Sequence, residues 1–162
     1  SGLMVTHDPE EAMSICDKVA VMNDGKIHQI DTPINLLNNP KTIFVSSFIL
    51  GNNIINLKKN GNSYISCLGE INCSEYLKNT SIKSMSISPK FISIKRSESG
   101  DAIVISKEFL GEFLIYKVSI NGNILRVRTD INNLLNNGDK CSLSINKNSY
   151  YFLYPGAYKE YI

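Results

Sequence analysis

The sequence has no tryptophan, only two histidines and no long apolar run. Two histidines exclude a metal site built from several imidazoles. No apolar stretch approaches the ~20 residues that a membrane-spanning helix requires, and the N-terminus has no charged-then-apolar signal pattern. The four cysteines, Cys16, Cys67, Cys73 and Cys141, are scattered without a CxxC pair. This cysteine pattern predicts reduced cytosolic thiols rather than a disulfide framework or a zinc site.

The chain also lacks a strong excess of charge of either sign. Its 17 Lys and Arg against 15 Asp and Glu leave a net charge of +2, so charge alone indicates neither a nucleic-acid nor a membrane-surface partner. A hydrophobic content of 43% excludes wholesale disorder. With 162 residues, the chain has room for one medium domain or two small ones.

Familiar catalytic motifs are missing as well. The sequence contains no GxxxxGK[ST] phosphate loop, no GxGxxG, no HExxH and no GxSxG. Neither histidine lies near Cys16 in sequence, so no cysteine–histidine pair is indicated. The residues therefore predict no self-contained catalytic centre and no bound metal or cofactor in this chain.

The first 50 residues mix helix and strand patterns. Asp8 and Pro9 are typical of a helix start, followed by Glu10 and Glu11 where the helix dipole favours acids. The Asp24-Gly25 pair between two apolar runs indicates a β-hairpin. The expected elements are a β-prone tail at Leu3–Thr6, a helix from Pro9 to about Asp17, hairpin strands at Lys18–Met22 and Lys26–Ile30, and helices at Thr32–Asn38 and Thr42–Ile49.

After Gly51 the pattern is strand throughout. The expected strands are Ile54–Lys58, Tyr64–Leu68, Ser84–Ile87, Ile92–Lys95, Ala102–Phe109, Leu114–Ile120, Ile124–Thr129, Lys140–Ile145 and Tyr150–Leu153. They are short and separated by Asn, Gly, Ser and Pro clusters, in which Asn pairs such as Asn52-Asn53 mark turns. Regularly spaced short strands predict a small barrel or sandwich, so the fold class is mainly β.

One constellation of residues stands out near the N-terminus. Its first part, residues 5–12, reads Val-Thr-His-Asp-Pro-Glu-Glu-Ala and contains His7. Its second part reads Asp-Lys-Val-Ala-Val-Met-Asn-Asp-Gly-Lys at 17–26 and ends with Asp-Thr-Pro at 31–33. A histidine between a strand and a helix start is well placed to touch an anion. Spacing alone favours a structural role for a lone histidine.

This stretch resembles the end of the nucleotide-binding domain of ATP-binding cassette (ABC) import ATPases. In that family a strand runs into a Thr-His-Asp switch motif and Glu-Glu-Ala, and then into Asp-Arg-Ile-Ala-Val-Met-x-x-Gly-x-Ile-x-Gln-x-Gly-Thr-Pro. Lys18 and Asp31 replace the usual Arg and Gly. Downstream, Asn39-Pro40, Phe44-Val45 and Ser47-Phe48-Ile49 resemble the family's linker, so the resemblance spans Val5–Ile55.

The remainder of the chain resembles the transport-associated OB ("TOBE") regulatory domain of the same ATPases. Pro89 matches a proline of the family, while Ser88 and Lys90 replace its Arg and Glu. The later strands match at Phe109-Leu-Gly111, Tyr116-x-Val118, Leu125-x-Val127 and Gly138. The resemblance implies residues 1–50 as an α/β remnant of the ATPase domain with its linker, and residues 51–162 as an OB-like β-barrel of TOBE or MOP type.

The resemblance implies that ATP hydrolysis belongs to an intact subunit and not to this chain alone. His7 would be the switch histidine that contacts the γ-phosphate and its water in an intact subunit, which binds ATP and magnesium and hydrolyses ATP to power uptake. Phosphoryl transfer needs nucleotide, magnesium and water positioned together. Because the phosphate loop, signature and Asp-Glu motifs are missing here, we expect a C-terminal fragment that is inactive alone. The intact subunit would sit on the cytoplasmic face of the inner membrane through permease subunits.

The transported solute and the molecular role remain open at this stage. The short regulatory domain is most similar to that of ferric-iron importer ATPases, and spermidine/putrescine importers share the linker style. An OB-like module that binds single-stranded nucleic acid is a further alternative, with the C-terminal aromatic residues as stacking platforms. The balanced charge favours core and interface aromatics, and hence no nucleic-acid partner.

We also expect the β-rich half to form a two-fold homodimer. The segment 150–154 is apolar on both faces, and one small barrel is expected to cover only one of them. Aromatic residues are favoured at interfaces, so Tyr151, Phe152 or Leu153 is predicted at or beside the contact.

Overall fold

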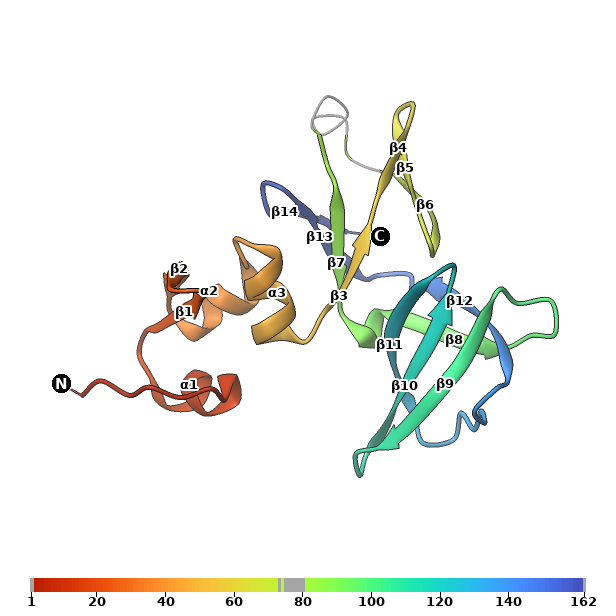
Figure 1. Ribbon diagram of the computed structural model, residues 1–162, viewed down its shortest axis with the longest axis horizontal. Coiled ribbons are helices and arrows are strands. Elements are labelled where there is room, and N and C mark those ends of the chain that lie inside the picture. The colour runs from red at the N-terminus through yellow and green to blue at the C-terminus, as the bar shows by residue number, and fades with distance from the viewer. Residues whose placement is uncertain (1, 73, 75–80, 162) are drawn as a thin grey trace.

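The computed structural model describes residues 2–72, 74 and 81–161, and it confirms a mainly β protein, in which the α-helices of the described residues lie near the N-terminus (Figure 1). Cys73 lies outside the described residues. Two groups of buried side chains exist, a small one in the N-terminal segment and a large one within the β sheets. The architecture is therefore an N-terminal helical unit joined to a β region.

The N-terminal unit contains three helices and one hairpin. These are α1 (Pro9–Ile15), β1 (Val19–Asn23), β2 (Lys26–Asp31), α2 (Pro33–Asn38) and α3 (Ile43–Leu50). The side chains of Asp8, Thr32 and Thr42 accept hydrogen bonds from backbone N–H groups in the first turns of the three helices. The unit's small core is formed by Val21, Leu36 and Val45. The predicted helices and hairpin of this half are confirmed, with α1 ending at Ile15 rather than at about Asp17.

Two antiparallel sheets form the upper part of the β region in Figure 1. One has the strand order β14-β13-β7-β3 and the other the order β4-β5-β6. Their bounds are β3 (Asn53–Asn56), β4 (Lys58–Asn60), β5 (Ser63–Ser66), β6 (Gly69–Asn72), β7 (Ser84–Ile87), β13 (Tyr150–Tyr154) and β14 (Tyr158–Tyr161).

A five-stranded antiparallel sheet forms the lower part, with the order β11-β10-β9-β12-β8. Its strands are β8 (Ile92–Arg96), β9 (Ala102–Phe109), β10 (Phe113–Ile120), β11 (Asn123–Asp130) and β12 (Lys140–Ile145), preceded by the short 3₁₀ helix η2 (Pro89–Phe91). The sheet curls so that its outer strands β8 and β11 lie close together. This is consistent with an OB-like domain, although no strand ladder closes a barrel within the described residues.

The nine expected strands are present, with bounds shifted by a few residues. The expected strand Ile54–Lys58 is divided between β3 and β4, and the short strands β6 and β14 had no predicted counterpart. Leu3–Thr6 belongs to no strand of this chain, and Leu3 is 96% exposed. An unpaired strand edge recruits other strands, so we expect this segment either to be mobile or to pair with another copy.

The expectation that one face of the segment 150–154 stays uncovered is wrong. Strand β13 lies inside a sheet between β7 and β14, and Tyr151, Phe152, Leu153 and Tyr154 are each at most 3% exposed. The two faces of the strand are covered by this chain's own residues. Tyr151, Phe152 and Leu153 therefore have no free surface with which to form a dimer contact.

Asn53 connects two sheets through its side chain. Its Oδ1 accepts a hydrogen bond from the backbone N–H of Arg126, and its Nδ2 donates to the Arg126 carbonyl, both at 2.7 Å. Asn53 begins β3 and is buried, whereas Arg126 lies on β11, the edge strand of the five-stranded sheet. At this point of the edge strand, the Asn53 side chain makes the hydrogen bonds that a neighbouring strand would otherwise make with β11.

Replacing Asn53 with alanine is expected to destabilise the protein by about 2–3 kcal/mol, because two part-buried hydrogen bonds are lost and the backbone N–H and C=O of Arg126 lose their partner. Urea unfolding measures the change in the free energy of unfolding. The matched control is Asn132→Ala in an exposed turn, which should cost far less. Equal losses for the two variants would contradict the role assigned to Asn53.

Candidate functional site: the junction of the two units and the His7 segment

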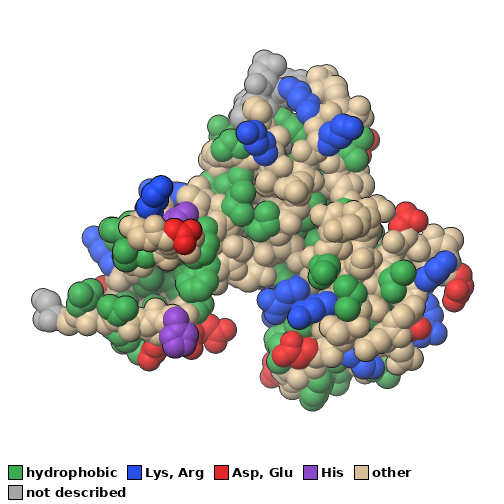
Figure 2. All heavy atoms as spheres, viewed as in Figure 1, with side chains coloured by type: hydrophobic (Ala, Val, Ile, Leu, Met, Phe, Trp, Pro, Cys, Tyr) green, Lys and Arg blue, Asp and Glu red, His purple; other side chains and the backbone are tan. Residues whose placement is uncertain are grey.

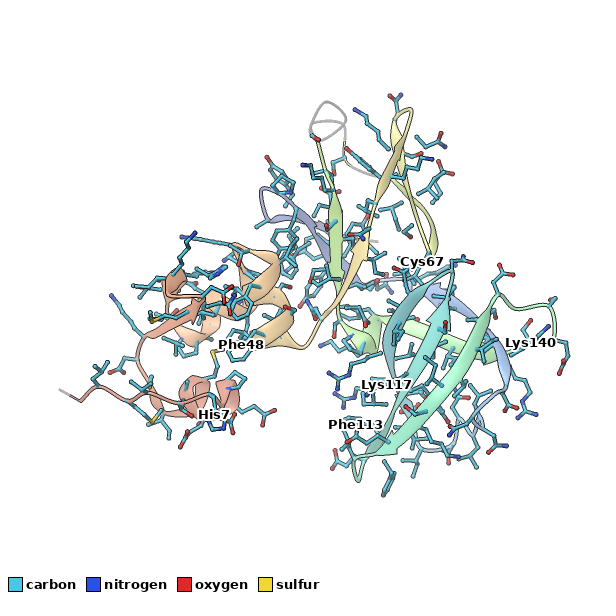
Figure 3. All side chains as sticks on the ribbon, in the orientation of Figure 1. His7, Phe48, Cys67, Phe113, Lys117 and Lys140 are labelled. Atoms are coloured by element: carbon cyan, nitrogen blue, oxygen red, sulfur yellow. The ribbon has the colours of Figure 1, made fainter. Side chains whose placement is uncertain are left out.

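His7 lies directly before α1 and its side chain is exposed. Figure 3 shows it on the N-terminal unit, away from the β sheets. The neighbouring Asp8 carboxylate accepts hydrogen bonds from the backbone N–H groups of Glu10 and Glu11, which fixes the start of the helix. The helix therefore positions His7 at a surface, where an anion has access to the imidazole. Its predicted role as switch histidine stays a prediction.

The second histidine has a structural position. The Nδ1 atom of His28 lies 3.3 Å from the Thr42 hydroxyl, and its ring packs against Phe44 with the ring centroids 4.9 Å apart. His28 thus helps to hold α3 against the hairpin, and the two histidines are not brought together as a pair of ligands. Within the described residues, no group of three His, Cys, Asp or Glu side chains is arranged to hold a metal ion.

Cys16, Cys67 and Cys141 are free thiols. Burial raises the pKa of the Cys67 thiol, and burial together with the nearby Asp139 carboxylate raises that of Cys141. A raised pKa disfavours the reactive thiolate. The local environment therefore makes these two thiols poor nucleophiles.

The junction between the two units is a buried polar network. The Ser46 hydroxyl on α3 and the Ser86 hydroxyl on β7 are hydrogen-bonded, and the Asn52 amide donates to both, at 3.2 Å and 3.0 Å. Both serines are fully buried. Because hydrogen bonds between buried polar groups are directional, this network fixes how α3 sits against the four-stranded sheet.

Tyr154 adds a second link across the same junction. Its hydroxyl donates a 2.8 Å hydrogen bond to the carbonyl of Pro40, which lies between α2 and α3. Burial raises the pKa of Tyr154 to about 12, and a hydrogen bond with Ser46 offsets part of this rise. Tyr154 is thus held as a neutral phenol that ties the end of β13 to the N-terminal unit.

A pocket of about 400 Å³ opens beside this junction. Its walls come from α2, α3 and the start of β13, and Lys90 also lines it. The lining residues are Leu37, Asn38, Ile49, Leu50, Asn52, Ser88, Lys90 and Tyr150. The pocket brings together no catalytic set of side chains, so its chemistry is limited to binding.

Most of the C-terminal aromatic rings are not available for stacking on bases. Tyr151, Phe152 and Tyr154 are buried, the Lys159 ammonium lies over the Tyr150 ring, 4.0 Å from its centroid, and Tyr161 is largely exposed. Single-stranded nucleic acid binds to exposed aromatic faces along a basic groove. The burial of Tyr151, Phe152 and Tyr154 argues against the nucleic-acid alternative.

The sequence pattern does not indicate the cationic face that β10 and β11 form. Lys117 lies directly opposite Arg126 in the ladder, and Arg128 lies two residues further along β11. All three side chains are exposed, and the guanidinium of Arg128 stacks over the Phe113 ring, 3.7 Å from its centroid. Figure 2 shows Lys and Arg side chains gathered on the side of this sheet that borders the N-terminal unit. Knowledge of the strand register would have revealed this face.

Comparison with curated proteins finds similarity to ATP-binding subunits of importers. The spermidine/putrescine import ATP-binding protein PotA of Bacillus thuringiensis (strain Al Hakam) is 54% identical over 63 residues, which cover 39% of this chain and 18% of that protein. The proteins of the same name from Desulfitobacterium hafniense (strain Y51) and Trichormus variabilis are 53% identical over 53 residues and 56% identical over 52. These relatives are importer ATP-binding proteins.

The match covers less than a fifth of the length of these relatives. No family model matches the chain. No helix within the described residues is both long and apolar enough to span a membrane.

Replacing Tyr154 with phenylalanine is expected to lower the free energy of unfolding by about 1–2 kcal/mol at pH 8, because the buried Pro40 carbonyl loses its donor. The neutral phenol is favoured by folding, so its contribution is complete below the unfolded pKa near 10 and is lost as the pH rises towards 12. The stability difference between the two proteins should therefore shrink over this pH interval. Denaturant titrations at several pH values measure it.

The control is Tyr161→Phe, at an exposed position on β14, which should change the stability little at pH 8. A constant difference between wild type and Tyr154→Phe from pH 8 to pH 12 would contradict the assigned state of the phenol.

Proposed function

We propose that this chain is the C-terminal region of the ATP-binding subunit of an ABC importer and that the imported solutes are spermidine and putrescine. The observation that carries the proposal is the 54% identity over 63 residues to importer proteins of that name. The expectation of ferric iron has no support among these relatives, and the polyamine alternative takes its place.

In this proposal the two units have different roles. Residues 1–50 supply the switch histidine, His7, and residues 51–162 form the regulatory TOBE-type domain. In the intact subunit, His7 contacts the γ-phosphate of ATP and the attacking water, with magnesium bound beside them. The intact subunit works as a homodimer on the cytoplasmic face of the inner membrane, where permease subunits hold it.

Deleting the coding segment for this chain from the source organism is expected to reduce uptake of labelled spermidine and putrescine to background. Ferric-iron uptake by the same cells should be unchanged, since the proposed solutes are polyamines. Loss of iron uptake with normal polyamine uptake would overturn the assignment of the solute.

Restoring the deleted segment with His7→Ala should leave polyamine uptake at background, because the γ-phosphate contact is missing. The matched control is His28→Gln, which changes the histidine that packs on Phe44 and should restore uptake. Normal uptake with His7→Ala would remove the switch role from His7 while leaving the solute assignment intact.

The isolated 162-residue chain is expected neither to bind nor to hydrolyse ATP. Its sequence has no phosphate-gripping motif, and a lone histidine cannot position nucleotide, magnesium and water together. Phosphate release in the presence of Mg²⁺ and ATP provides the measurement. Hydrolysis above the buffer background that disappears with His7→Ala would contradict this prediction.

A further inference from the structure

The pocket beside the junction has two hydrogen-bond donors from the η2 segment. Ser88 precedes η2, and its hydroxyl makes no capping hydrogen bond with that helix. Lys90 lies within η2, is exposed, and makes no ion pair with the described residues. Its ammonium lies 5.0 Å from the centroid of the Phe91 ring. Both side chains are therefore free to donate hydrogen bonds to an anionic group of a ligand.

The α3 side of the pocket offers acceptors instead. The Nδ2 atom of Asn52 is already engaged by Ser46 and Ser86, so Oδ1 is the polar atom of that amide left for a ligand among the described residues. Helices α2 and α3 both end at the pocket. The last turn of a helix has carbonyl groups without intrahelical donors and carries partial negative charge. This side of the pocket therefore favours a cationic donor.

The rest of the lining is largely apolar. Leu37, Ile49 and Leu50 supply aliphatic groups, and Tyr150 supplies a ring. Lys90 is the one charged residue of this lining. A volume of about 400 Å³ is near the lower end of the range of about 300–1,000 Å³ for small-molecule sites. The pocket therefore suits a small ligand with one negative group, one positive group and an aliphatic body.

We propose that this pocket binds a free apolar amino acid, with leucine as the type ligand. The α-carboxylate accepts hydrogen bonds from the Lys90 ammonium and the Ser88 hydroxyl. The α-ammonium donates to Asn52 Oδ1 and to the carbonyl end of α3, and the side chain packs on the aliphatic residues. A phosphate dianion would exceed the single positive charge of the lining, and a diamine would bring a second ammonium towards Lys90.

The two donors stand where this chain departs from the pattern of importer ATPases. Ser88 and Lys90 occupy the positions of an Arg and a Glu in that pattern. A glutamate at position 90 would repel a carboxylate, so the lysine creates a site that the pattern lacks. This site goes beyond the proposed function, and it does not depend on which solute is imported.

Isothermal titration calorimetry of the full chain with leucine tests the proposal. A dissociation constant of about 1 mM or lower is expected for so small a ligand. Isoamylamine lacks the carboxylate and isocaproate lacks the ammonium, so each should bind at least about tenfold more weakly, having lost a charge-assisted hydrogen bond. Alanine should also bind at least about tenfold more weakly, because it buries less aliphatic surface.

The variant Lys90→Glu should weaken leucine binding at least about tenfold, because it replaces the carboxylate's partner with a like charge. Lys90→Arg keeps the cation and should retain binding. The matched control is Lys95→Glu, which makes the same charge change at an exposed position of β8 outside the pocket and should bind leucine like wild type.

Urea unfolding without ligand checks that each variant is folded. Leucine should raise the midpoint for wild type and Lys95→Glu, since a ligand that binds the folded state stabilises it, and should leave Lys90→Glu unchanged.

Three outcomes would overturn the proposal. Neither heat nor a shift of the urea midpoint at about ten times the expected dissociation constant would mean that the pocket does not take the amino acid. Equal binding of leucine and isoamylamine would make it a site for amines alone. Unchanged binding by Lys90→Glu would place leucine elsewhere on the chain. These measurements use the isolated chain, so they leave the uptake experiments and the solute assignment untouched.

Discussion

The arrangement of the whole chain depends on the hydrogen bonds of two consecutive amides, Asn52 and Asn53. The Asn52 amide donates to Ser46 and Ser86 and so connects helix α3 with β7. The Asn53 amide pairs with the backbone of Arg126 and connects β3 with the edge of the five-stranded sheet. Gly51 precedes them with a left-handed φ of 62°, which ends α3 and turns the chain towards β3. Three residues thus join the helical unit and two sheets.

Polar side chains suit a junction of this kind better than apolar ones. Hydrophobic contact is non-directional, so two apolar faces tolerate some sliding. A satisfied network of hydroxyl and amide groups has one favourable geometry, and breaking it leaves buried groups without partners. The Tyr154 hydroxyl on Pro40 adds a contact between segments 114 residues apart. The helical unit is therefore held to the β region by directional hydrogen bonds as well as by the burial of apolar surface.

The sequence predicts local features of this protein well, because their causes lie within a few residues. Asp8, Thr32 and Thr42 cap helices, and Asp24-Gly25 forms the hairpin turn with positive φ at both positions. Local patterns do not predict the long-range contacts of a residue. The Asn52-Asn53 pair predicts a turn, yet the Asn53 side chain binds the backbone of Arg126, 73 residues away. The aromatic strand β13 has apolar residues on both faces because other residues of the same chain cover both of them. The local pattern alone does not distinguish such a buried strand from one at a dimer interface.

The same limit explains why the sequence pattern does not indicate the cationic face of Lys117, Arg126 and Arg128. Lys117 and Arg126 are nine residues apart, and they become neighbours only through the register of the β10–β11 hairpin. Arg126 also shows how the junction and this face are connected: its backbone is held by Asn53, while its guanidinium lies near Gly51 at the end of α3. The backbone and the side chain of Arg126 thus both lie against the residues that join the two units, so the position of β11 is fixed by the same short segment that ends α3.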